Sequence, residues 1–239
     1  MLTQYLKNNI RKPLLNSGTK LLVCDMAGTL INEQGIIYES LYKCLKNNNM
    51  DVKKEDMVIW HGMKKEEVIS NVVRKSYKGN KSLELTSEIN NELICLLNEE
   101  YFNSSKIKLI HPKLPEYLTN LRNNNIKIAL NTGYTSSIQQ SLIHKFNMKD
   151  YIDDYICGDD VNNGRPYPYM IFKLMERNNI INVKDVVKIG DTKNDILEGK
   201  NAGCGQVISV LSGAENIKQL EKYKPDLIVE NITDIKLNK

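Results

Sequence analysis

The sequence predicts an α/β protein built on a parallel sheet, with a helical bundle inserted into the chain. After Pro112, short apolar runs alternate with helical patterns, which is typical of strands joined by helical crossovers. Between residues 36 and 110, apolar residues instead recur at helical spacing, and we expect no strand there. We therefore expect one core formed by residues 1–35 and 111–239, and a helical insertion formed by residues 36–110.

The composition narrows the class of protein. The chain has 239 residues, of which 41% are apolar and 26% charged, so one domain with a sizeable insertion can bury a core. The net charge of +4 comes from scattered lysine and arginine without a dense basic block, which does not favour nucleic-acid binding. A small anionic substrate is compatible with the same charge.

The cysteines and the apolar runs indicate the compartment. The five cysteines form no CxxC pair, so we expect no disulfide framework and no zinc site, and we expect a reducing environment. The first 16 residues lack the apolar segment of a signal peptide, and no apolar run approaches membrane-spanning length. We therefore expect a cytoplasmic protein without a membrane partner.

The first predicted strand is the apolar run of residues 21–24, which ends at Asp25. Residues 1–19 contain a leader in which Pro13 and Gly18 interrupt any long helix. A wholly apolar run is typical of a central parallel strand, and its carboxyl end is where open α/β sheets bind ligands. Asp25 is thus a candidate reactive or metal-binding group, with an ordinary turn aspartate as the alternative.

The insertion contains four helical stretches, at residues 38–48, 53–60, 64–77 and 83–102. The third stretch has an apolar stripe of Val68, Ile69, Val72 and Val73. On a helical wheel Lys65 falls near the middle of this stripe, whereas Lys64 points away from it. A lysine at such a position is either desolvated, which lowers its pKa, or extends its amine to water.

The second half of the chain continues the sheet. Helices are expected at residues 114–124, 136–146, 169–178 and 196–202. Strands are expected at residues 126–130, 155–157, 186–189, 206–210 and 226–229. Strands that alternate with helices pair in parallel through right-handed crossovers, so their carboxyl ends lie along one edge of the sheet.

Polar residues of complementary types follow the predicted strands. Asp25, Thr132 and Asp191 come close after three strand ends, and Asp195 lies four residues beyond the last of them. Arg165 lies in a stretch that two prolines stiffen. Each residue alone is compatible with a turn aspartate, a helix-cap threonine or a surface arginine. Their combination at one sheet edge predicts a site.

The residue types predict phosphoryl chemistry at this site. Carboxylate oxygens from Asp25, Asp191 and Asp195 suit Mg²⁺, which favours a few carboxylates together with substrate phosphate. Arg165 and the metal would neutralise a phosphoryl group, and Thr132 with the amides of the following helix start would donate hydrogen bonds to it. Asp25 would attack phosphorus in line and form an aspartyl-phosphate.

Four motifs in this order resemble those of the haloacid dehalogenase (HAD) superfamily. They are Asp25-Met26-Ala27-Gly28-Thr29, Leu130-Asn131-Thr132-Gly133, Gly164-Arg165-Pro166 and Gly190-Asp191-Thr192-Lys193-Asn194-Asp195. Within the superfamily the sequence is most similar to phosphonatases, on the first of these motifs and on three further stretches. These are Asn131-Thr132-Gly133-Tyr134, Gly164-Arg165-Pro166-Tyr167-Pro168 and Glu198-Gly199-Lys200-Asn201-Ala202-Gly203.

The resemblance implies a Rossmann-like core with a helical cap inserted after the first motif. It also implies that the metal is bound by Asp25, Asp191, Asp195 and the backbone carbonyl of Ala27. The substrate would contact Ala27, Gly28, Thr29, Thr132, Gly133, Arg165 and His61.

Ala27 distinguishes the sequence from ordinary HAD phosphatases, which have an aspartate there as general acid. Phosphonatases share the alanine and use a cap lysine as a Schiff base, so that the carbon leaving group departs as an enamine. Lys65 matches that lysine in its spacing from Gly62. Val68 and His61 stand where phosphonatases have a histidine and a methionine, and His61 is a candidate for a relocated proton donor.

These observations predict a Mg²⁺-dependent, phosphonatase-like hydrolase with Asp25, Lys65, Thr132 and Arg165 as catalytic residues. Two alternatives stay open. One is a phosphomonoester phosphatase acting on phosphoglycolate or a sugar phosphate, and the other is a phosphate-binding protein with little turnover. The expected partner is a small phosphate or phosphonate molecule, and the sequence also leaves a homodimer open.

Overall fold

The structure is a computed structural model that describes residues 14–61, 63–103 and 106–238. Most of the expected leader, and Gly62, whose spacing from Lys65 entered the prediction, lie outside the described residues. At the start of the described chain, the backbone amide of Leu15 donates to the carbonyl of Lys236, 2.9 Å away.

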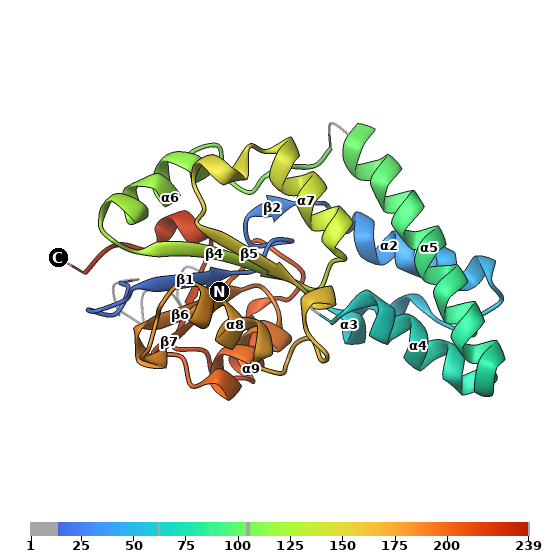
Figure 1. Cartoon of the computed structure of the whole chain (residues 1–239). Coiled ribbons are helices and arrows are strands. Elements are labelled where there is room, and N and C mark those ends of the chain that lie inside the picture. The colour runs from blue at the N-terminus through green and yellow to red at the C-terminus, as the bar shows by residue number, and fades with distance from the viewer. Residues whose placement is uncertain (1–13, 62, 104–105, 239) are drawn as a thin grey trace.

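Six parallel strands form the core sheet in the order β5-β4-β1-β6-β7-β8 (Figure 1). They are β1 (Leu21–Cys24), β4 (Lys127–Thr132), β5 (Asp154–Cys157), β6 (Val186–Gly190), β7 (Gln206–Val210) and β8 (Leu227–Val229). Strand β1 is central, since Leu21 pairs with Lys127 on one side and with Val186 on the other. The predicted parallel α/β fold is confirmed.

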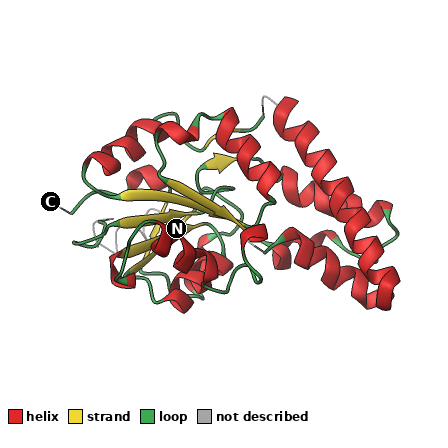
Figure 2. Ribbon diagram, viewed as in Figure 1, coloured by secondary structure: helices red, strands yellow, loops and turns green. Residues whose placement is uncertain are grey.

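Helices cover both faces of this sheet (Figure 2). They are α6 (Leu114–Asn123) and α7 (Ser136–Lys145) on one face, and α8 (Tyr169–Arg177) and α9 (Lys193–Ala202) on the other. Successive side chains of a strand point to opposite faces. In β1, Leu22 and Cys24 accordingly pack in the cluster that holds the apolar residues of α6 and α7, while Leu21 and Val23 pack against α8. Burial on both faces explains the unbroken apolar runs.

The helices before residue 104 extend to one side of the sheet (Figure 1). They are α2 (Ile36–Asn47), α3 (Met57–Trp60), α4 (Lys65–Ser76) and α5 (Gly79–Asn103). The expected stripe of α4 is buried, and it packs in one apolar cluster with Leu41 and Leu45 of α2 and with Ile89 and Leu93 of α5.

A small antiparallel ladder joins the two chain segments that connect the helical bundle to the sheet. Strand β2 (Ile31–Asn32) pairs with β3 (Lys108–Leu109), and the amide of Ile110 donates to the carbonyl of Leu30 at 2.8 Å. The prediction that residues 36–110 contain no strand is therefore wrong. A strand of two residues has no alternation to detect, and its partner is distant in the sequence.

Other differences from the prediction are shifts of boundaries and one short helix. Strand β4 runs on to Thr132, and α9 begins at Lys193 because Thr192 and Asp195 form a capping box at its start. Helix α10 (Ile217–Glu221) was not predicted. All five cysteines are free thiols, as expected. Among the described helices, none combines the length and the apolar character that crossing a membrane requires.

Candidate active site

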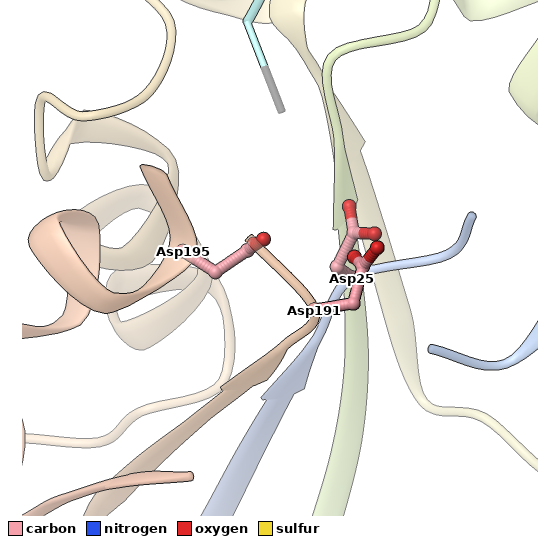
Figure 3. Close-up of side chains that lie close together, drawn as sticks. All are labelled: Asp25, Asp191 and Asp195. Atoms are coloured by element: carbon pink, nitrogen blue, oxygen red, sulfur yellow. The ribbon is translucent and has the colours of Figure 1, made fainter. Parts of the chain in front are cut away.

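Three aspartates converge at the carboxyl edge of the sheet (Figure 3). Asp25 and Asp191 follow the adjacent strands β1 and β6, and Asp195 projects toward them from the first turn of α9. One carboxylate oxygen of each lies within 4.8 Å of the other two, and all three side chains are buried. The expected convergence of these residues is present in the structure.

Arg165 links two of the aspartates. Its guanidinium Nη1 lies 2.8 Å from Oδ1 of Asp25 and also donates to Asp195, and the side chain is buried. Its Nε is buried without a hydrogen-bond partner among the described residues. A buried guanidinium with a free N–H is suited to a further anionic ligand, because guanidinium groups bind phosphate oxygens with two parallel donors.

Asp25 and Asp191 both have a raised pKa, because the buried cations near them do not offset burial and the crowding of carboxylates. Burial raises the pKa of Asp191 well above its usual range, and the nearby charges of Asp25 and Asp195 raise it further. Burial likewise raises the pKa of Asp25, although Arg165 opposes that effect. Two crowded carboxylates of raised pKa form a hard, anionic donor set of the kind that Mg²⁺ prefers, so the residues fit such an ion.

Asp195 is held as a charged group. Its Oδ2 accepts from the hydroxyl of Thr192 at 2.5 Å. Burial alone would raise its pKa, but the cations of Arg165 and Lys188 hold the pKa well below the usual range. Asp195 therefore remains a carboxylate. It orients Arg165 and offers an oxygen near those of Asp25 and Asp191.

A second, fully buried cation was missed by the sequence-based prediction. Lys188, in the middle of β6, donates to Oδ1 of Asn131 at 2.7 Å and to Asp195 at 2.8 Å, and it lies 3.4 Å from Glu198. Asn131 in turn donates to both carboxylate oxygens of Glu198. A lysine within an apolar strand, next to motif residues, is the only signal that the sequence offers for this network.

Replacing Lys188 by Met should cost about 3–5 kcal/mol of unfolding free energy, because the change leaves two buried carboxylates without their shared cation. Urea denaturation measures this cost. The matched control is Lys20→Met, which breaks an exposed ion pair with Asp185 and should cost at most about 1 kcal/mol. Equal costs for the two variants would contradict the role assigned to Lys188.

The loop before α4 contacts three glycines on the core. A Cβ atom on Gly133 would meet the carbonyl oxygen of Met63 at 2.8 Å, and Gly158 and Gly164 pack against the side chain of Lys64. The carbonyl of residue 61 accepts from the side chain of Asn194 at 2.6 Å. The bundle thus contacts the carboxyl edge of the sheet closely, which requires small residues there.

Lys65 is buried at this contact. Its Nζ lies 4.8 Å from the ring centroid of Tyr38 and 6.0 Å from that of Tyr134, and it donates to the carbonyl of Met63 at 3.1 Å. Burial is the main reason that its pKa is lowered to about 8; the charge of Arg165 acts in the same direction, and the carboxylates of Glu33, Asp25 and Asp191 act against it. Lys64 instead forms ion pairs on the other side of the helix start. The wheel-based distinction between the two lysines agrees with these contacts.

A cavity of about 400 Å³ opens beside the aspartates. Its walls include Ala27, Gly28, Glu33, Tyr38, His61 and Asp191. His61 stacks at a tilt on Tyr38, 4.6 Å between ring centroids, and its Nδ1 is buried without a partner among the described residues. Burial and the charges of Lys65 and Lys193 lower its pKa to about 4, so its ring is neutral at pH 7.

The remaining predicted site residues include Gly28 and Thr29, which follow β1, and Thr132, which ends β4. Thr29 donates to Asp191 at 3.5 Å, and the hydroxyl of Thr132 accepts from the amide of Tyr134 at 3.2 Å. Gly28 has a φ of +74°, and a Cβ there would collide with Asp191, so only glycine fits without strain. Of these residues, Gly28 lines the same cavity as Asp191.

The parallel core, the inserted helices and the acidic edge define an HAD-like protein. The family model described as haloacid dehalogenase-like hydrolase matches residues 22–210. The chain therefore belongs to the haloacid dehalogenase-like hydrolase family.

The chain is similar to phosphonoacetaldehyde hydrolases in sequence and to HAD-like proteins in structure. A phosphonoacetaldehyde hydrolase of Bacillus cytotoxicus is 36% identical over 115 residues, which cover 47% of this chain and 44% of the relative. The matched stretch thus spans less than half the length of the curated relative. Among solved structures, a phosphonoacetaldehyde hydrolase-like protein of Oleispira antarctica has a TM-score of 0.73 at 18% identity, over 92% of this chain and 91% of that one.

A predicted phosphoglycolate phosphatase of Haemophilus somnus is similar to the same extent, with a TM-score of 0.73 and 20% identity, over 91% of this chain and 96% of that one. At such identities the two structures establish the fold that they share with this chain.

Proposed function

We propose that the protein is a Mg²⁺-dependent hydrolase of a small phosphonate, which cleaves the carbon–phosphorus bond of phosphonoacetaldehyde through a Schiff base on Lys65. The observation that carries this proposal is the amine of Lys65, which is buried between two tyrosine rings with a pKa of about 8. The partial sequence similarity to phosphonoacetaldehyde hydrolases supports the same substrate class.

In the proposed reaction, the helical bundle supplies the amine and the edge of the sheet supplies the nucleophile. The free amine of Lys65 condenses with the aldehyde, and the iminium so formed makes the carbon a good leaving group, which departs as an enamine. Asp25 attacks phosphorus in line and becomes phosphorylated, and water then releases phosphate. Bound Mg²⁺ would supply charge neutralisation at the phosphoryl oxygens, held by Asp25, Asp191, Asp195 and the carbonyl of Ala27.

Two further groups would bind the phosphoryl oxygens. The free Nε of Arg165 offers a donor, and the hydroxyl of Thr132 lies at the end of the neighbouring strand. We propose that residues 36–110 act as a cap that excludes water from the site. The contacts of Met63 and Lys64 with core glycines support this, because they join the helical bundle to the edge of the sheet that carries the aspartates.

The pH dependence of imine formation should follow Lys65. Below pH 8 the amine is increasingly protonated and unreactive, so the rate should rise with pH through about 8 and then level off. At pH 7 roughly a tenth of the amine would be neutral, about 300 times more than in an ordinary lysine. The rate of borohydride-trappable adduct between about pH 6 and 10 measures this. A rate that still climbs tenfold per unit near pH 10 would contradict it.

The experiment that tests the proposal is a substrate panel. Phosphate release is measured with phosphonoacetaldehyde, phosphoglycolate, a sugar phosphate and p-nitrophenyl phosphate, with Mg²⁺ and with chelator. We expect Mg²⁺-dependent release of phosphate and acetaldehyde from the phosphonate. Release from the esters alone would identify a phosphomonoesterase instead. Metal-dependent binding without release would identify a phosphate-binding protein.

A further inference from the structure

Glu33 is a buried carboxylate that faces the cavity from the core side. It follows β2, only 6% of it is exposed, and it lines the cavity together with His61 and Asp191. Its Oε2 accepts from the phenol hydroxyl of Tyr134 at 2.5 Å. The contact fixes the carboxylate at the wall of the cavity, although Asn32-Glu33-Gln34-Gly35 is a sequence typical of a turn.

The same carboxylate is a charged neighbour of Lys65. The ring of Tyr134, whose hydroxyl binds Glu33, lies 6.0 Å from Nζ of Lys65. Among the charged neighbours of Lys65, Glu33 has the strongest effect on its pKa, and it raises that pKa. Glu33, Tyr134 and Lys65 thus form one cluster, in which the carboxylate lines the cavity and the amine lies near the ring of Tyr134.

Schiff-base chemistry needs a group that carries protons beside the amine, and three other positions considered for that role do not offer one. Ala27 has no ionisable group. Val68, on the same helix as Lys65, is an apolar side chain buried in the core. His61 has a pKa of about 4, so little of it is protonated at pH 7. A carboxylate is able to take up and release protons in this role.

We propose that Glu33 is a catalytic acid–base residue of the imine chemistry, with Tyr134 as the positioning residue that orients it. This inference rests on the proposed function. Glu33 takes a proton from the ammonium of Lys65, and the freed nitrogen lone pair forms a bond to the aldehyde carbon. As the carbinolamine forms, one nitrogen proton moves to the former carbonyl oxygen.

The proton held by Glu33 then completes the step. It passes to the carbinolamine hydroxyl, the carbon–oxygen bond breaks with its electron pair on oxygen, and water leaves. The nitrogen lone pair forms the carbon–nitrogen double bond of the iminium, and Glu33 returns to its carboxylate form. The ammonium and the aldehyde are thereby converted into an iminium and one water molecule, and no other reactant is needed.

The test compares Glu33→Gln with wild type in the rate of borohydride-trappable adduct formation with phosphonoacetaldehyde. We expect about a 100-fold slower rate, the size of a typical acid–base contribution. A purely electrostatic role predicts the opposite, because loss of the negative charge would lower the pKa of Lys65 and free more amine. The matched control is Glu39→Gln, which changes a half-buried glutamate on the same cavity and should stay within about 3-fold of wild type.

Further variants keep the inference testable if Glu33→Gln does not fold. Tyr134→Phe retains the carboxylate and removes its donor, and we expect about a 10-fold slower rate from the lost orientation. Glu33→Ala should recover part of its rate when formate is added, which a structural role would not produce. Trapping by Glu33→Gln at the wild-type rate would overturn the role of Glu33 alone. Absence of any adduct with wild type would overturn the proposed function, and this inference with it.

Discussion

Replacing Asp25 by Asn should abolish phosphate release, with a loss of about 10³-fold or more, while the protein stays folded. The amide cannot attack phosphorus, so no phosphorylated intermediate forms. Stability should not fall, because burial and Asp195 already disfavour the charge of Asp25, as its raised pKa indicates. The amide oxygen can still accept the hydrogen bond from Arg165.

Two measurements separate loss of the nucleophile from loss of the fold. The urea midpoint of Asp25→Asn should equal or exceed that of the wild type, whereas phosphate release should be at background. Borohydride trapping at Lys65 should persist in this variant, because imine formation precedes the attack on phosphorus. Activity within about tenfold of wild type would show that another group attacks phosphorus.

Replacing Lys65 by Arg should abolish carbon–phosphorus cleavage, again by about 10³-fold or more. The guanidinium keeps the positive charge between the rings of Tyr38 and Tyr134, but it remains protonated and forms no imine. Acetaldehyde production from phosphonoacetaldehyde measures the loss.

The control for Lys65→Arg is the neighbouring lysine. Lys64 pairs with Glu66 and Asp159 and not with the tyrosine rings near Lys65, so Lys64→Arg should retain activity within about 3-fold. If both variants lose activity equally, the loss comes from disturbed packing of the loop against the core. If both variants keep their activity, Lys65 has no covalent role.

Much of the site follows from local sequence patterns. Asp25, Thr132 and Asp191 were predictable because each lies at or directly after the end of a buried parallel strand, and parallel strands bring their carboxyl ends to one edge. The orientation of Lys65 was predictable from the period of its helix, since the apolar stripe identifies the face that packs inward.

The residues that were missed depend on contacts between distant segments. Lys188 interrupts an apolar strand, and only the fold shows that Asn131, Asp195 and Glu198 surround it. Glu33 lies in a polar stretch typical of a surface turn, yet Tyr134, a hundred and one residues further on, holds it at the cavity wall. No local period encodes such pairs, and the same is true of the ladder between β2 and β3.

We propose that a lysine in the helical bundle activates the leaving group, because Ala27 cannot act as a general acid. The most direct test reduces the wild-type protein with borohydride in the presence of phosphonoacetaldehyde and maps the modified peptide by mass spectrometry. We predict modification of Lys65, and its absence when the substrate is omitted. Turnover of phosphonoacetaldehyde without any modified lysine, or modification confined to a lysine other than Lys65, would contradict the claim.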